Sequence, residues 1–75
     1  MKNHVTSKDL AGRIRLVMQL RKLTVAGAAE CCGMPQPTLE TYLYGQHLPG
    51  AQALADLATG LNCSVDWLLL GTVPA

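Results

Sequence analysis

The sequence is poor in aromatic and charged residues. It has no phenylalanine, one tryptophan and two tyrosines, and 15% of its 75 residues are charged against 49% that are hydrophobic. Leucine, alanine, valine, methionine and cysteine must therefore fill the core. Such an apolar chain is expected to be globular rather than disordered. Its length is enough for one small domain, whose core stays modest unless close packing or association adds to it.

Long apolar stretches are also missing. No run approaches the roughly 18 residues of a membrane span, and the first 13 residues, MKNHVTSKDLAGR, have no apolar core of the signal-peptide kind. We therefore expect a cytoplasmic protein with no membrane partner.

Patterns that carry catalysis or bind metals are absent as well. The three cysteines, Cys31, Cys32 and Cys63, form no CxxC pair, so we predict small buried thiols in a reducing compartment rather than disulfides or a zinc site. Neither His4 nor His47 lies in a Ser or Cys nucleophile motif, and there is no Gly-rich phosphate loop or carboxylate pair. We predict a non-enzymatic protein with no cofactor, metal or small-molecule substrate.

Basic residues are absent from Leu23 onward. The first 22 residues contain all six basic residues and one acidic residue, Asp9, and so have a net charge of +5. The remainder contains four acidic residues and has a net charge of −4. The bases are Lys2, Lys8, Arg13, Arg15, Arg21 and Lys22. A solvated helix face is the ordinary interpretation of these charges, and contact with phosphates is the alternative. The acidic remainder is unfavourable for a nucleic-acid-binding protein.

Apolar periodicity predicts five short helices and no strand. The first begins at Thr6 or Ser7 and carries a core stripe of Leu10, Ile14, Val17 and Met18. Leu16 and Leu20 fall off this stripe. The favoured interpretation is that the tail or a neighbouring helix covers them, and the alternative is contact with another subunit.

Capping residues bound the other four helices. Thr24 caps the second, from Val25 to Cys32, and Gly33 ends it. The third starts near Gln36, with Pro37 in its first turn, and stops at Gly45. The fourth runs from about Ala51 to Gly60, where Gly60 or Asn62 can end it, and the fifth runs from the Ser64 cap to Gly71. The prediction is a single all-α domain spanning residues 1–75, with residues 1–6 a flexible N-terminus and 72–75 a tail.

The stretch from Leu23 to Gly45 has the layout of a helix-turn-helix. Two short helices flank a tight break at Gly33–Pro35, with small residues where the helices would touch and with Leu39 and Tyr42 facing inward. In such a unit the second helix enters the major groove of DNA.

From roughly Arg13 to Gly71 the sequence resembles the phage repressor and Cro-type (lambda repressor-like) helix-turn-helix domains. Ala29, Gly33, Leu39 and Tyr42 match positions inside the motif, and the closing run LNCSVDWLLLG is very similar to the fifth helix of the family. The resemblance implies a transcriptional regulator of phage or prophage type. It would bind a two-fold operator in double-stranded DNA as a homodimer, with the recognition helix at about 36–44.

The resemblance also implies roles for single residues. Base contacts would come from Gln36, Pro37, Glu40 and Thr41. Phosphate contacts would come from Thr24, Tyr44, Gln46 and His47. The basic residues Arg21 and Lys22 are added to these contacts because they lie near the motif.

Departures from the family pattern leave a second function open. Val25 stands where relatives often have a DNA-contacting Gln, and Met18 and Leu43 replace an Arg–Glu ion pair. Pro35 replaces the usual Ser or Thr cap, so we expect poorer backbone satisfaction there, and the following loop has no Lys or Arg. The alternative is a protein-interaction module that keeps the fold without strong DNA binding.

Overall fold

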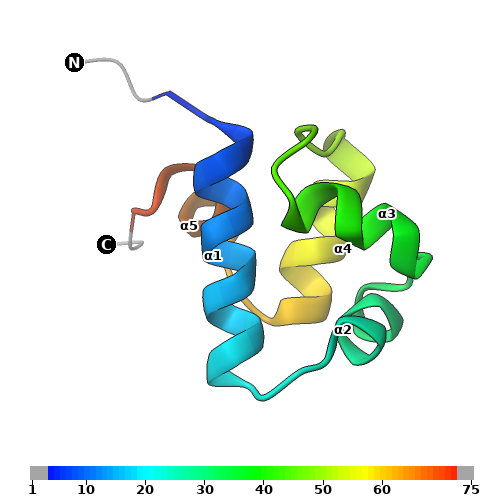
Figure 1. Cartoon of the computed structure of the whole chain (residues 1–75). Coiled ribbons are helices and arrows are strands. Elements are labelled where there is room, and N and C mark those ends of the chain that lie inside the picture. The colour runs from blue at the N-terminus through cyan, green and yellow to red at the C-terminus, as the bar shows by residue number, and fades with distance from the viewer. Residues whose placement is uncertain (1–3, 73–75) are drawn as a thin grey trace.

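A computed structural model describes residues 4–72 as an all-α domain (Figure 1). The helices are α1 (Ser7–Leu20), α2 (Val25–Cys32), α3 (Gln36–Leu43), α4 (Ala51–Leu61) and α5 (Val65–Leu70). No strand occurs in this part of the chain. The predicted fold class is therefore confirmed.

Side-chain caps begin three helices at the predicted residues. The hydroxyl oxygens of Thr6, Thr24 and Ser64 accept hydrogen bonds from backbone N–H groups three positions later, at 3.1, 3.0 and 3.0 Å respectively. The Thr24 cap explains why a glycine stands at position 27 inside a helix, which the sequence alone does not explain. A Cβ at Gly27 would lie 3.2 Å from the Thr24 hydroxyl oxygen and would press on the cap.

Left-handed residues close α2, α4 and α5, at Gly33, Asn62 and Gly71. Asn62 is one of the two predicted ends of the fourth helix, and the other, Gly60, lies inside that helix. The helix α3 ends at Leu43, with Tyr44 as its C-cap, before left-handed Gly45 is reached. The helix α4 continues through Gly60 to Leu61.

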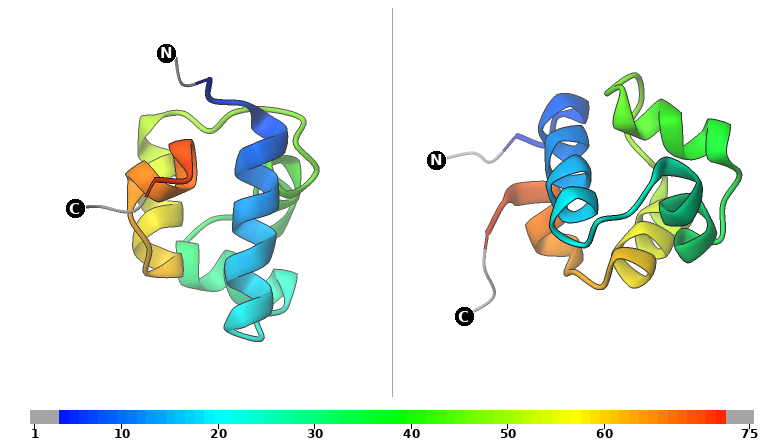
Figure 2. Two further views of the ribbon diagram at one scale, coloured as in Figure 1. Left: turned by 90° about the vertical axis from the view of Figure 1, so that its left-hand side faces the viewer. Right: turned by 60° about the horizontal axis from the view of Figure 1, so that its bottom comes forward.

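Gly60 is required by packing instead of by the helix end. A Cβ there would lie 2.6 Å from the Cys31 carbonyl oxygen and from the Cys32 Cα. Both are backbone atoms, which no rotamer change can move. The absence of a side chain at Gly60 therefore allows α4 to lie directly against α2, a contact visible in the right-hand view of Figure 2.

The core lies where the five helices meet. Its largest fully buried side chains are Leu10, Ile14, Leu39, Leu57, Leu61 and Leu68. The predicted α1 stripe is buried throughout. Leu16 and Leu20, in contrast, are 45% and 73% exposed among the described residues. The interpretation that a neighbouring helix covers them is therefore wrong for residues 4–72, and residues 73–75 of the tail, the other predicted cover, lie outside the described residues.

Two arginines of α1 and Arg21, its C-cap, donate hydrogen bonds to the C-terminal carbonyl groups of three other helices. Arg13 bonds the Leu68 and Leu69 oxygens of α5 at 3.0 and 3.1 Å. Arg15 bonds the Leu43 oxygen of α3 at 3.0 Å, and Arg21 bonds the Leu61 oxygen of α4 at 2.7 Å. Carbonyl groups at a helix C-terminus lack intrahelical partners and carry partial negative charge, so each guanidinium stabilises a helix end. The interpretation of these arginines as a merely solvated face is wrong.

Candidate nucleic-acid interface

The helix α3 presents a polar outer face. Leu39 and Leu43 are buried against the core, Gln36 and Pro37 are exposed, and Glu40 and Thr41 are partly exposed. The four residues expected to contact bases therefore all reach the surface along one helix.

Hydrogen bonds within α3 order three of these side chains. The Gln36 amide nitrogen lies 3.5 Å from a Glu40 carboxylate oxygen, one turn along. The Thr41 hydroxyl donates to the Pro37 carbonyl oxygen at 3.1 Å. Because the hydroxyl proton of Thr41 is engaged in this hydrogen bond, Thr41 can offer a ligand only its methyl group and its oxygen lone pairs.

The start of α3 has fewer orphaned donors than the missing cap implies. Pro35 is the N-cap residue of α3, and it makes no side-chain capping hydrogen bond, in keeping with the expectation from the sequence. Pro35 and Pro37, however, have no N–H group to leave unpaired, and the Thr38 N–H bonds the Pro35 carbonyl oxygen at 3.0 Å. The prolines therefore limit the loss of backbone hydrogen bonds.

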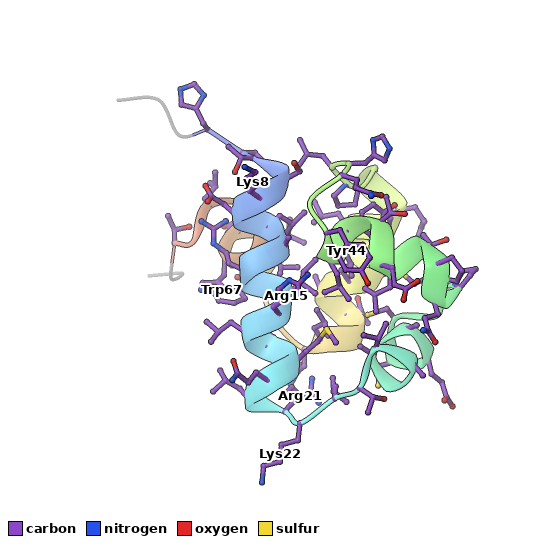
Figure 3. The ribbon with its side chains drawn as sticks, in the orientation of Figure 1. Lys8, Arg15, Arg21, Lys22, Tyr44 and Trp67 are labelled. Carbon is purple, nitrogen blue, oxygen red and sulfur yellow. The ribbon has the colours of Figure 1, made fainter. Side chains whose placement is uncertain are left out.

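Beyond α3, Arg15 and Tyr44 form a cation–aromatic pair. Tyr44 is 62% exposed, and the guanidinium carbon of Arg15 lies 5.8 Å from the centre of its ring. Figure 3 shows the two side chains together between α1 and α3. Gln46 and His47 follow in the exposed loop. Sequence reasoning did not select Arg15 as a site residue, although its place one turn from the core residues Ala11 and Met18 could have indicated a position facing another helix.

The other expected phosphate contacts lie elsewhere on the domain. Arg21 and Lys22 are at the far end of α1 from Lys8, and Lys22 extends away from the body of the domain (Figure 3). Arg21 is engaged with Leu61, and the hydroxyl of Thr24 accepts from Gly27. The six residues therefore form two groups, one around the α1–α2 turn and one after α3.

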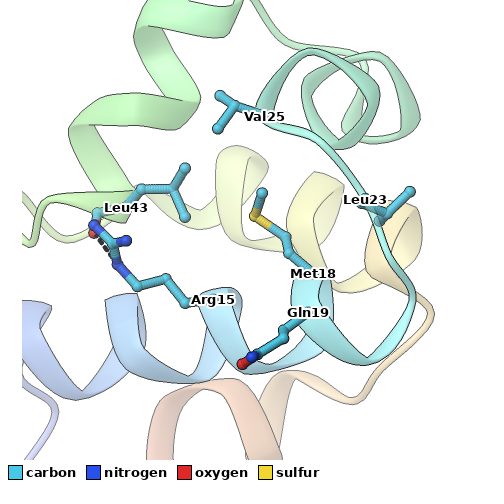
Figure 4. A pocket seen from close by; sticks show the side chains of 6 residues that line it. All are labelled: Arg15, Met18, Gln19, Leu23, Val25 and Leu43. Atoms are coloured by element: carbon cyan, nitrogen blue, oxygen red, sulfur yellow. Dashed lines mark hydrogen bonds between the residues drawn. The ribbon is translucent and has the colours of Figure 1, made fainter.

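A hollow of about 400 Å³ lies between α1, the start of α2 and the end of α3 (Figure 4). It is lined by Arg15, Met18, Gln19, Leu23, Val25 and Leu43. Met18, Val25 and Leu43 are the three positions at which the sequence departs from the Arg, Gln and Glu of the repressor pattern. The three departures from the family pattern therefore lie together at one hollow, beside the polar side chains of Arg15 and Gln19.

Cys32 and Cys63 are poor candidates for chemistry, whereas Cys31 is exposed, so the prediction that all three thiols are buried is wrong for Cys31. Burial, followed by the neighbouring Cys31, raises the pKa of Cys32 to about 11, so its reactive thiolate is rare at neutral pH. Burial also raises the pKa of Cys63. Within residues 4–72, no group of three or more His, Cys, Asp or Glu side chains is placed to hold a metal ion. No helix among these residues has the length and apolar character needed to cross a membrane.

Comparison with known proteins agrees with this architecture. Residues 9–68 match the family described as "Helix-turn-helix domain". The chain belongs to this helix-turn-helix family. Among solved structures, it is similar to the P22 c2 repressor in complex with the synthetic operator 9T in the presence of Tl⁺. The TM-score is 0.78 at 25% identity, over 84% of this chain and 96% of the repressor chain. A search of curated proteins gives no match.

Proposed function

We propose that this helix-turn-helix domain is a sequence-specific DNA-binding transcriptional regulator of the phage or prophage repressor type. The exposed outer face of α3, held to α1 through Arg15, carries the proposal. It is supported by the similarity to a repressor bound to its operator. Two copies would bind a two-fold operator, with half-sites about one DNA turn apart.

Four side chains of α3 would face the bases. An amide such as Gln36 pairs bidentately with adenine, a carboxylate such as Glu40 accepts from the cytosine amino group, and a methyl group contacts thymine. Because the Thr41 hydroxyl proton is bonded to Pro37, its methyl group is the better contact. Pro37, exposed in the first turn, would offer a second apolar contact.

Phosphate contacts would come from both groups at the edges of α3. On one side, Thr24 and the first N–H groups of α2 favour an anion, and Lys22 extends into solvent. On the other side lie Tyr44, Gln46 and His47. We add Arg15 to this second group, because its Nε bonds Leu43 while its terminal nitrogens donate no hydrogen bond within the described residues. Arg21 would serve mainly to cap α4.

The small number of cations predicts weak electrostatic binding. Each neutralised phosphate adds about 0.9 to the slope of log affinity against log salt. Among the proposed phosphate contacts, Arg15 and Lys22 are the cations besides Arg21, which caps α4, so a dimer should show a shallow slope. A slope that corresponds to eight or more phosphates per dimer would contradict these assignments.

The rival function is a protein-interaction module. One observation favours it: the apolar side chains Met18, Val25 and Leu43 line one hollow, beside Arg15 and Gln19, at positions where relatives carry groups that serve DNA binding. Such a module would bind duplex DNA without sequence preference, or not at all.

Selection of bound duplexes from a random library tests the proposal. The regulator should enrich a two-fold sequence, whereas absence of enrichment at low salt supports the interaction module. Gln36→Ala and Thr41→Ala should then relax the preference at particular base pairs. Gln52→Ala is a matched control, because Gln52 bonds Asp56 one turn along α4 at 3.0 Å, as Gln36 does with Glu40. A uniform loss at every base pair would refute the roles of Gln36 and Thr41.

A further inference from the structure

The outward side of α1 carries a stripe, made of Asp9, Gly12, Leu16 and Leu20, that no other part of residues 4–72 covers. Successive members are three or four positions apart, so they lie in line along one helix face. The buried residues Leu10, Ile14 and Met18 occupy the opposite face. We refer to these four residues as the outer α1 stripe.

The fold of one copy gives no reason for this stripe. Leu16 and Leu20 are 45% and 73% exposed, and no atom among the described residues lies within 4 Å of a Cβ built on Gly12. A glycine inside a helix costs about 1 kcal/mol relative to alanine. At Gly60 a close backbone contact accounts for the glycine, but at Gly12 no such contact exists. A small residue beside two exposed leucines would allow a second helix to pack closely against this face of α1.

We infer that the outer α1 stripe binds a second copy of this chain, with the two α1 helices antiparallel and a two-fold axis at Leu16. Antiparallel pairing about Leu16 brings each Leu20 onto the Gly12 of the other copy. The large side chain then fills the space left by the absent one, at both ends of the contact. The stripe is therefore complementary to itself in size.

Charge favours the same orientation. Asp9, at the N-terminal end of α1, becomes level with the turn that carries Lys22 in the second copy. The opposed helix dipoles also bring positive ends beside negative ones. Lys8 lies about 100° around the helix from Asp9 and so stands outside the contact. In a parallel pair, by contrast, like charges would be adjacent at each end.

This two-fold axis is compatible with the proposed DNA-binding function. Only the placement of the two α3 helices on one DNA duplex rests on that proposed function; the dimer contact does not. Rotation about an axis perpendicular to the plane of the two helices turns the same flank of each copy to the same side. Arg15 and α3 lie on one flank of α1, and Arg13 with α5 on the other. Both recognition helices would therefore face a single DNA duplex.

The contact is small, so association should be weak without DNA. A 14-residue helix is about 21 Å long, and one helix pair buries less than the roughly 1,200–2,000 Å² of a stable interface. We expect reversible dimers at high micromolar concentration.

Disulfide trapping of the folded chain tests the register. Substitutions Cys31→Ser and Cys63→Ser first remove the two accessible native thiols. Leu16→Cys should then form a disulfide dimer with itself, and a mixture of Gly12→Cys and Leu20→Cys should form the mixed dimer. Leu20→Cys alone should not, because its two copies would be eight positions apart along the helix. Efficient self-linking of Leu20→Cys, or no linking of any variant, would overturn the inference.

Sedimentation without DNA tests the surface independently of DNA binding. Leu16→Glu and Leu20→Glu should abolish dimers, whereas Leu48→Glu, at a loop leucine 48% exposed, should not. Circular dichroism verifies that each variant is folded. If the Leu16 and Leu20 variants lower the melting temperature of a protein that is monomeric throughout, the chain itself covers the stripe and the inference is wrong. Dimers without sequence enrichment would refute the proposed function alone.

Discussion

The Nε of Arg15 donates a hydrogen bond to the carbonyl oxygen of Leu43 at 3.0 Å and thereby ties α1 to the end of α3. In the repressor pattern, an Arg of the first helix and a Glu of the third make this connection through an ion pair. Here Met18 and Leu43 occupy those positions, and Arg15 reaches the backbone instead of a side chain. The helix α3 is thus held by a positive charge at a position other than the one that carries the Arg of the family pattern.

Arg15→Met should weaken both stability and DNA binding. It removes a charge-assisted hydrogen bond at a partly exposed site, which contributes about 1 kcal/mol to the free energy of unfolding. It also removes one phosphate contact, so the salt slope of DNA binding should fall by about one per subunit. Urea denaturation and affinity measured at several salt concentrations check the two effects.

Arg13→Met is the matched control, because Arg13 caps α5 as Arg15 caps α3. It should cost similar stability and leave the salt slope unchanged. Equal slopes for the Arg13 and Arg15 variants would remove Arg15 from the interface.

Gly60→Ala should destabilise the domain. The new methyl group would lie 2.6 Å from backbone atoms of Cys31 and Cys32, and such overpacking costs about 1–3 kcal/mol. The same substitution at Gly12, where the Cβ meets open space, should stabilise by up to about 1 kcal/mol. Thermal denaturation of dilute protein measures both. A neutral Gly60→Ala would mean that α2 and α4 separate easily.

If the Arg and Glu of the family pattern are restored at Met18 and Leu43, the effects of the two substitutions on stability should be coupled through the attraction of their charges. Either Met18→Arg or Leu43→Glu alone places an unpaired charge at a buried position and should cost about 3 kcal/mol or more. The double variant should cost less than the sum of the two, by roughly 0.5–3 kcal/mol. A double-mutant cycle in urea measures this difference. Strict additivity would show that the side chains do not meet across α1 and α3.

The cysteines should differ in reactivity. Cys31 is exposed and should be alkylated first, whereas buried Cys32 should be protected near neutral pH because its pKa is raised to about 11. Mass spectrometry of partly alkylated protein gives the order. Faster labelling of Cys32 than of Cys31 would contradict the close α2–α4 contact.

The same thiol predicts a pH dependence of stability. Since the folded pKa of Cys32 is raised from 9.0 to about 11, the unfolded chain loses this proton first, and stability should fall between these pH values. Cys32→Ala should reduce this fall relative to the wild type. An unchanged profile would show that Cys32 ionises equally in both states.

Much of the fold follows from the sequence because its signals are local. The Thr6, Thr24 and Ser64 caps and the left-handed end at Gly33 depend on residues within one or two turns, and all lie where they were predicted. The core stripe of α1 follows likewise from helical period alone. The four α3 residues expected to face DNA are on the surface for the same reason, although their contacts stay a prediction.

Tertiary structure decided the roles of residues whose partners are distant in the chain. Gly60 was one of two candidate ends of the fourth helix, but it lies inside α4 and allows the crossing of α4 with α2. The arginines were interpreted as solvated but cap α5, α3 and α4, with partners 28 to 56 positions away. A guanidinium on a long flexible stem has no local preference for such a partner, and the direction of a neighbouring helix end depends on packing. The sequence by itself therefore determined the helices and the polar face of α3, while the packing of α1 decided what holds that face in position.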